Sequence, residues 1–184
     1  MIFFTADPHF GHENIIRLCN RPFASADEMD AALIRNWNAT VGPRDEVYIL
    51  GDFTIRPAAQ AHECLAALNG RKYFIRGNHD KFLKGFGPFE RDLEWVKDYH
   101  RLVYEGRRFI LFHYPIAEWD CFFRGAIHLY GHVHNSATSA ARLPDGLAFN
   151  VGVDCHDFRP VCIEQILELA AEREARLPPL VNSY

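Results

Sequence analysis

Seven side chains that can bind metal ions lie in five short clusters between residues 7 and 134. In chain order they are Asp7, His9, Asp52, Asn78, His113, His132 and His134. Carboxylates, imidazoles and an amide oxygen, with no thiolate among them, suit cations such as Mn²⁺, Fe and Zn²⁺. Two such cations about 3.5–4 Å apart can hold the attacking and leaving oxygens of a phosphoryl displacement. The residue types therefore point to a two-metal hydrolase.

Each cluster directly follows a short apolar segment of the kind that forms a buried strand. The segments are residues 2–5, 47–50, 73–75, 109–112 and 127–130. In open α/β sheets, ligands bind just beyond the carboxyl ends of the strands. We therefore expect five strand ends to bring the seven side chains together at one site.

Two of the clusters contain a pair of candidates separated by one residue. Asp7 and His9 form one pair, and His132 and His134 form the other. In an extended segment this spacing places both side chains on the same side, so each pair is predicted to face one site. Taken singly, an aspartate beside proline or glycine is a common turn residue, and a lone histidine more often packs than binds metal. The recurrence at five strand ends favours the metal site.

The elements that must position these clusters alternate between strand and helix in the N-terminal half. Ser25 and Glu28 match a capping box, which predicts a helix through Thr40. Pro57 suits the first residue of a second helix, which ends near Asn69. With strands at residues 2–5, 46–50 and 72–76, this order predicts a parallel, buried sheet.

The C-terminal half has a different pattern. Residues 99–104 and 108–112 flank a turn at 105–107 and predict a hairpin. Further strands are expected at residues 127–130, 147–151 and 161–163, followed by a helix over 164–176. We expect one α/β domain over residues 1–184, of which residues 177–184 form a loosely held tail.

Charge and cysteine content narrow the class of protein. The 184 residues include 20 basic and 24 acidic side chains, a formal net charge of −4. A non-specific nucleic-acid binder would normally be basic, so that class is disfavoured. Five scattered cysteines without a C-x-x-C pair favour a reducing compartment. No leader and no apolar run of about 20 residues is evident, so we expect a cytoplasmic protein without a membrane partner.

These motifs resemble those of the calcineurin-like metallophosphoesterases. The matching segments, in order, are Asp7-Pro8-His9, Gly51-Asp52, Gly77-Asn78-His79-Asp80, His113 and Gly131-His132-Val133-His134. The opening stretch over residues 3–12 is most similar to that of small single-domain bacterial and phage members. The resemblance implies an α/β fold, a four-layer α/β/β/α sandwich of the metallo-dependent phosphatase type, with a dinuclear metal site at one edge.

The resemblance also implies how two divalent metal ions are held. Manganese is the expected metal, with iron or zinc as alternatives. One ion would be bound by Asp7, His9, Asp52 and His134, and the other by Asp52, Asn78, His113 and His132. Asp52 would thus bridge the two, and a hydroxide shared by both ions would attack the phosphorus.

Three residues are implied to contact the substrate, namely Asn78, His79 and Arg56. His79 would be the general acid that protonates the leaving group. Arg56 has the position of a phosphate-contacting arginine, although a solvated surface arginine fits equally well. Many members carry an aspartate that orients this histidine, where the present chain has Ile55. Another acid, such as Asp80, would then have to replace it.

The expected function is hydrolysis of a small phosphodiester or phosphomonoester, including nucleotide-like molecules. A short chain without a cap insertion leaves the site open, which slightly favours a phosphodiesterase. Two alternatives are a catalytically silent scaffold of the same fold and a metal-dependent nuclease. The presence of all seven candidate ligands argues against the scaffold, and the acidic net charge argues against the nuclease.

Overall fold

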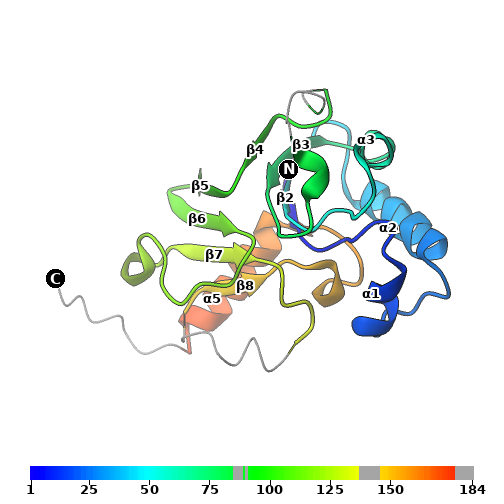
Figure 1. The fold of residues 1–184 in the computed structure, drawn as a ribbon. Coiled ribbons are helices and arrows are strands. Elements are labelled where there is room, and N and C mark those ends of the chain that lie inside the picture. The colour runs from blue at the N-terminus through cyan, green and yellow to red at the C-terminus, as the bar shows by residue number, and fades with distance from the viewer. Residues whose placement is uncertain (85–88, 90, 137–145, 177–184) are drawn as a thin grey trace.

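Two β-sheets packed face to face form the centre of the molecule (Figure 1). The computed structural model describes residues 1–84, 89, 91–136 and 146–176. The first sheet has the strand order β4 (Trp95–Lys97), β3 (Arg71–Ile75), β2 (Glu46–Leu50), β1 (Ile2–Thr5) and β9 (Val161–Cys162). The second has the order β5 (Tyr99–Tyr104), β6 (Arg107–Phe112), β7 (Ile127–Tyr130) and β8 (Ala148–Asn150).

The first sheet is parallel from β1 to β4, as the alternation of strands and helices predicts, and only β9 runs antiparallel. Its strands are buried on both faces, because successive side chains point to opposite sides. In β1, Phe3 packs into the core beneath the helices, whereas Phe4 packs into the core between the two sheets. Parallel strands that all end at one edge place the loops after β1, β2 and β3 side by side.

Helices cover the outer face of the first sheet. They are α1 (Glu13–Leu18), α2 (Ala26–Thr40) and α3 (Ala58–Ala66). Ser25 caps α2 as predicted, since its Oγ accepts a hydrogen bond from the Glu28 N–H at 3.2 Å. The Glu28 carboxylate accepts from Ala24 N–H instead of Ser25 N–H. Pro57 is the N-cap of α3, so the helix begins at Ala58, one residue later than predicted.

The second sheet contains the predicted hairpin, because β5 and β6 pair antiparallel around Glu105 and Gly106. Its outer face is covered by the segment from residue 116 to 126, which includes the 3₁₀ turn η3 (Phe122–Arg124). Trp119 is the main side chain there, and its indole N–H donates to the Ala126 carbonyl oxygen at 2.9 Å. Helix α5 (Ile163–Glu174) closes the edge between the two sheets.

This architecture confirms the expected fold class, a mixed α/β sandwich whose two sheets are flanked by helices. The layer outside the second sheet is thin, because an irregular segment and not a long helix forms it. The predicted tail from residue 177 lies outside the described residues. In the part of the chain that the structure describes, no helix has the length and apolar character required to cross a membrane.

His128, on β7, is fully buried between carbonyl groups. Its Nδ1 lies 3.1 Å from the Ile110 oxygen, and its Nε2 lies 3.2 Å from the Tyr114 oxygen. A neutral imidazole has one N–H and can donate only one of these two bonds. Burial nevertheless lowers the pKa of His128 to about 4, because the charged ring is poorly solvated inside the sheet.

Folding is therefore predicted to depend on the protonation of His128. The unfolded chain binds this proton near pH 6.5 and the folded chain near pH 4, so stability is complete above pH 6.5 and falls as the pH drops through this window. Metal-free wild type should lose about 3 kcal/mol more unfolding free energy between pH 7 and pH 4 than His128→Gln. Urea denaturation at several pH values measures this difference, and parallel curves would contradict it.

Candidate metal centre

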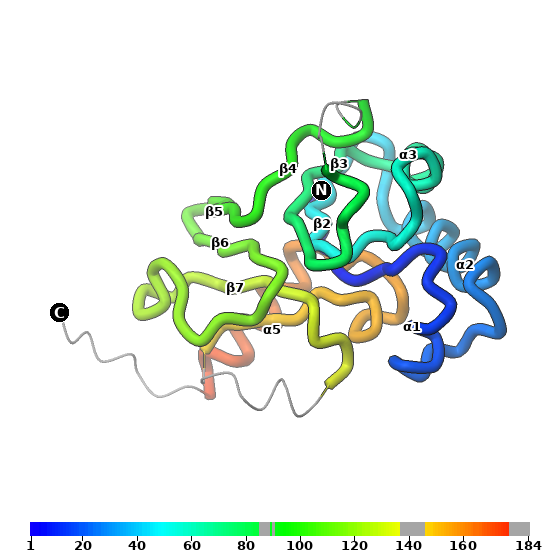
Figure 2. The backbone as a smooth tube through the Cα atoms, in the orientation of Figure 1, coloured from blue at the N-terminus to red at the C-terminus, as the bar shows by residue number. Residues whose placement is uncertain are grey.

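Loops from both sheets meet at one edge of the sandwich, where backbone hydrogen bonds join them. Asp7 N–H donates to the Gly51 oxygen at 3.0 Å, and His9 N–H donates to the Asp52 oxygen at 3.1 Å. Ala6 N–H, after β1, donates to the Val151 oxygen, after β8, at 3.0 Å, which joins the first sheet to the second. The loop after β1 can be followed in Figure 2 as it leaves the first sheet toward α1. Strand ends distant in the sequence therefore surround one site.

The seven predicted side chains gather there in two groups. Asp7, His9 and His134 form one, and Asp52, His113 and His132 form the other; in each group the potential ligand atoms lie within 4.8 Å of one another. Asn78 joins the second group, since its Oδ1 lies 3.1 Å from His113 Nε2.

The Asp52 carboxylate belongs to the second group and also lies close to the first. Its Oδ2 is 3.7 Å from His9 Nε2 in the first group and 3.5 Å from His113 Nε2 in the second. Burial alone would raise the pKa of Asp52, but the hydrogen bond and charge of His113 and the backbone N–H of His79 outweigh it and lower the pKa to about 2. A carboxylate that stays ionised between two histidine groups has the position expected of a bridging ligand.

Five of the seven candidates have left-handed backbone conformations, with φ between 49° and 69°. They are Asp7, His9, Asp52, His132 and His134. Such a conformation costs about 1–3 kcal/mol for each non-glycine residue and persists where the surrounding structure holds it. An extended backbone was expected to place both side chains of each i, i+2 pair on the same side. These residues are not extended, so that argument is wrong. The expectation is also wrong for His132 and His134, which belong to different groups, whereas Asp7 and His9 share one.

Two buried polar atoms in the first group have no hydrogen-bond partner. They are Oδ1 of Asp7 and Nε2 of His9. Burial raises the pKa of Asp7 to about 7 and lowers that of His9 to about 3, so both side chains favour their neutral forms in the metal-free protein. A buried carboxylate oxygen and a buried imidazole nitrogen without hydrogen-bond partners, in side chains whose potential ligand atoms lie within 4.8 Å of one another, suit a bound cation. The residues therefore fit a metal ion.

Glycines keep the space around the two aspartates free. A Cβ atom on Gly131 would lie 2.5 Å from Asp7 Oδ2, and one on Gly77 would lie 2.3 Å from Asp52 Oδ1. Both distances are too short for any side chain to be accommodated without moving the carboxylate. The glycines that precede the histidine and asparagine clusters thus allow the loops to approach each carboxylate closely.

Asp80 binds backbone and does not orient His79. Its carboxylate accepts hydrogen bonds from the N–H groups of Asp52 at 2.8 Å, Phe53 at 2.8 Å and Gly77 at 2.7 Å. The expectation that Asp80 replaces the missing acid at Ile55 is therefore not met in this structure. Asp80 instead joins the loops after β2 and β3.

His79 is exposed beside the two groups. The centre of its ring lies 5.4 Å from that of His9 and 6.3 Å from that of His12. Its backbone N–H donates to Asp52 Oδ1 at 2.8 Å, which fixes where the side chain leaves the loop. Within the described residues, no carboxylate is hydrogen-bonded to the His79 ring. The sequence difference at Ile55 thus corresponds to a ring that lies beside the rings of His9 and His12.

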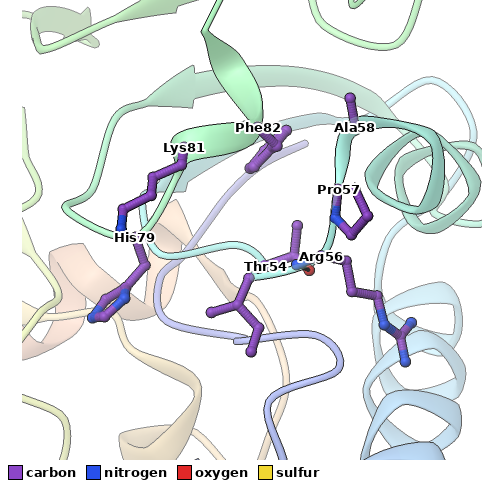
Figure 3. A pocket seen from close by; sticks show the side chains of 8 residues that line it. Thr54, Arg56, Pro57, Ala58, His79, Lys81 and Phe82 are labelled. Atoms are coloured by element: carbon purple, nitrogen blue, oxygen red, sulfur yellow. Dashed lines mark hydrogen bonds between the residues drawn. The ribbon is translucent and has the colours of Figure 1, made fainter.

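Arg56 is turned away from the site. Its guanidinium pairs with the Asp30 carboxylate of α2 at 2.7 Å and packs over Gly11. In Figure 3 the side chains of Arg56 and His79 diverge toward opposite sides of the view. Asp30 also accepts hydrogen bonds from Gly11 N–H at 3.0 and 3.1 Å, so this ion pair anchors the loop after β1 to α2. In this arrangement the Arg56 guanidinium is paired with α2, and its contact with a substrate phosphate stays a prediction.

Two residues that the sequence analysis did not assign to the site support its first group. Arg21 is buried and donates to the carbonyl oxygens of Asp7 at 2.8 Å and Pro8 at 2.9 Å. It also donates to both carboxylate oxygens of Asp154 at 2.8 Å. Asp154 in turn lies 2.8 Å from His134 Nδ1. Asp154 follows β8 and Gly152 with one residue between glycine and acid, a looser form of the strand, glycine and acid pattern that located Asp52.

The fold and the grouped carboxylates and histidines define a metallophosphoesterase-type protein. The sequence model of the calcineurin-like phosphoesterases matches residues 1–136, and the chain belongs to that family.

Relatives come from archaea, phages and bacteria. Uncharacterized protein MJ1445 of Methanocaldococcus jannaschii is 38% identical over 172 residues, which cover 91% of this chain and 90% of that protein. The Gene 66 protein of Mycobacterium phage D29 is 30% identical, with 96% and 98% covered. The crystal structure of AQ665, a protein of unknown function from Aquifex aeolicus, matches the fold with a TM-score of 0.72. The two sequences are 27% identical, and the match covers 92% of this chain and 98% of the AQ665 chain.

The contact between Asp154 and His134 gives a prediction for metal binding. Asp154→Asn removes the charge that holds the His134 ring and balances Arg21, so Mn²⁺ affinity should fall about 10–100-fold. Isothermal titration calorimetry of the metal-free variant measures this, with circular dichroism to establish that it is folded. Asp98→Asn, which removes an exposed partner of Arg76, is the control and should bind like wild type. Equal affinity in both variants would contradict a supporting role for Asp154.

Proposed function

We propose that this chain is a metal-dependent phosphoester hydrolase with a dinuclear centre. One divalent cation is held by Asp7, His9, Asp52 and His134, and the other by Asp52, Asn78, His113 and His132. The single observation that carries this proposal is the buried Asp52 carboxylate, which lies 3.7 Å from His9 in one group and 3.5 Å from His113 in the other.

Charge balance supports two cations in this site. Asp7 and Asp52 are both buried, and without compensating charge burial favours a proton on Asp7. When bound, a pair of divalent cations supplies positive charge for the phosphate and lowers the pKa of a water that can then attack at neutral pH. The nitrogen and oxygen ligand set suits manganese, with iron and zinc as the alternatives.

His79 is proposed to donate a proton to the leaving oxygen, and Asn78 to contact the phosphate. Both side chains are exposed at the surface of the site, where an incoming ester can reach them. The bond from His79 N–H to Asp52 Oδ1 holds the ring next to the bridging carboxylate. Because no carboxylate orients this ring in the described structure, we expect its contribution to lie toward the lower end of general-acid catalysis.

The proposed substrate is a small phosphoester, including nucleotide-like molecules, and a phosphodiester is slightly favoured. The exposure of Asn78 and His79 supports this preference, because groups on both sides of a diester need room. The acidic net charge of −4 disfavours a long nucleic acid. We infer that the two cations, and not a basic protein surface, attract the substrate.

Metal removal and loss of the bridging ligand test the proposal together. Chelation should reduce turnover of bis(p-nitrophenyl) phosphate and p-nitrophenyl phosphate by at least about 100-fold, and Mn²⁺ should restore it. Asp52→Asn should stay inactive when Mn²⁺ is added, because the shared ligand is lost, whereas Asp98→Asn should recover. Full turnover by protein that elemental analysis shows to be metal-free would overturn the proposal.

The role of His79 is tested by varying the leaving group. His79→Ala should reduce kcat for alkyl esters by about 100-fold, because an alkoxide needs a proton to leave. The same variant should lose less than about tenfold with p-nitrophenyl esters, whose leaving group is already stable as an anion. Steady-state kinetics on both esters make the comparison within a single protein. Equal losses would show that His79 positions the substrate without donating a proton.

A further inference from the structure

A hollow of about 540 Å³ opens beside His79, outside the two groups of candidate ligands (Figure 3). The connection from β2 to α3 contributes Thr54, Ile55, Arg56, Pro57 and Ala58 to its wall, and the segment after β3 contributes His79, Lys81 and Phe82. This volume falls within the range of pockets that bind small organic molecules. His79 is the residue that the hollow shares with the candidate catalytic site.

The hollow has a polar end and an apolar end. In Figure 3, His79 and Lys81 lie on one side, and Pro57 and Ala58 lie on the other together with Arg56, whose charge is paired with Asp30. Phe82 is largely buried and belongs to the core beneath the helices, so its part of the wall is firmly packed. A phosphoester has the same polarity, because its phosphate is charged and its alcohol portion can be apolar.

Ile55 adds an exposed aliphatic side chain to the wall of the hollow. It is 48% exposed, although it is a large aliphatic residue. Covering such a side chain with an apolar group releases water from both surfaces and favours binding. The Arg56 guanidinium does not oppose this effect, since it is held by Asp30 at 2.7 Å on the α2 side.

We propose that this hollow binds the alcohol portion of the substrate and selects an apolar group about the size of an aromatic ring. The inference rests on the proposed function, because it places the leaving oxygen beside His79. A group attached to that oxygen extends from the polar end toward Ile55, Pro57 and Ala58. Lys81 stays near the phosphate end, where its positive charge is favourable.

Two substrates that differ only in this group test the inference. 2-Phenylethyl phosphate and ethyl phosphate, or the corresponding diesters if the protein cleaves only diesters, release alcohols of similar acidity. We expect kcat/KM to be at least about tenfold higher for the phenylethyl ester. The same order should appear in the Kd values of 2-phenylethylphosphonate and ethylphosphonate, which are not hydrolysed, measured by calorimetry on the Mn²⁺-loaded protein.

Paired variants locate the effect in the hollow. Ala58→Phe fills the apolar end and should bring the ratio of the two esters close to one. Ala59→Phe, one residue further along α3 and outside the wall of the hollow, should keep the wild-type ratio. Ile55→Ser should also lower the ratio, whereas Ile55→Val should largely preserve it. The Ile55 pair provides a second route if Ala58→Phe fails to fold.

The outcomes separate this inference from the proposed function. If both esters are hydrolysed with equal kcat/KM and the phosphonates bind equally, the hollow does not select the alcohol and the inference is overturned. If the metal-loaded protein hydrolyses no phosphoester at all, the proposed function fails and the inference fails with it. A preference abolished by Ala58→Phe but kept by Ala59→Phe supports both.

Discussion

The geometry of the site depends on how the Asp80 carboxylate is hydrogen-bonded. This buried side chain accepts three backbone N–H groups, two from the loop after β2 and one from the loop after β3. Hydrogen bonds to a charged acceptor contribute about 1.5–3 kcal/mol each, so together they can offset the cost of burying the charge. Burial still raises the pKa of Asp80 to about 6. The carboxylate thus fixes the distance between the loops that carry Asp52 and Asn78.

The two halves of the site are supported by opposite charges. An acid, Asp80, joins the loops of the Asp52 group through their N–H groups, whereas a base, Arg21, joins the loop of the Asp7 group through its carbonyl oxygens. Asp154 then connects Arg21 to His134 in the more distant loop after β7. Left-handed backbone at five candidate ligands is maintained by these buried contacts, since each such residue would otherwise relax to a lower-energy conformation.

Much of this arrangement could be predicted from the sequence, because the apolar segments, their terminal polar residues and their order are local features. The parallel sheet, the hairpin and the convergence of the strand ends followed from them, whereas the two-sheet sandwich was implied by the family resemblance. The positions of Arg21, Asp154 and Arg56 could not be predicted in this way. Each pairs with a residue that is distant in the sequence or lies on a neighbouring helix. The residue type alone does not show whether an arginine or an aspartate is buried or solvated. The left-handed conformations were missed for a similar reason, because Asp and His adopt positive φ more often than other non-glycine residues but most of them do not.

The position of β1 has a consequence for how the protein acquires its structure. This strand lies between β2 and β9, and it pairs with β9 across almost the whole length of the chain. Until residues 161–162 arrive, one edge of β1 presents unpaired N–H and C=O groups. Contacts of such long range slow folding, and an open strand edge can pair with a neighbouring molecule. Aggregation during refolding is therefore expected to depend on protein concentration, and a short peptide that mimics β9 should suppress it.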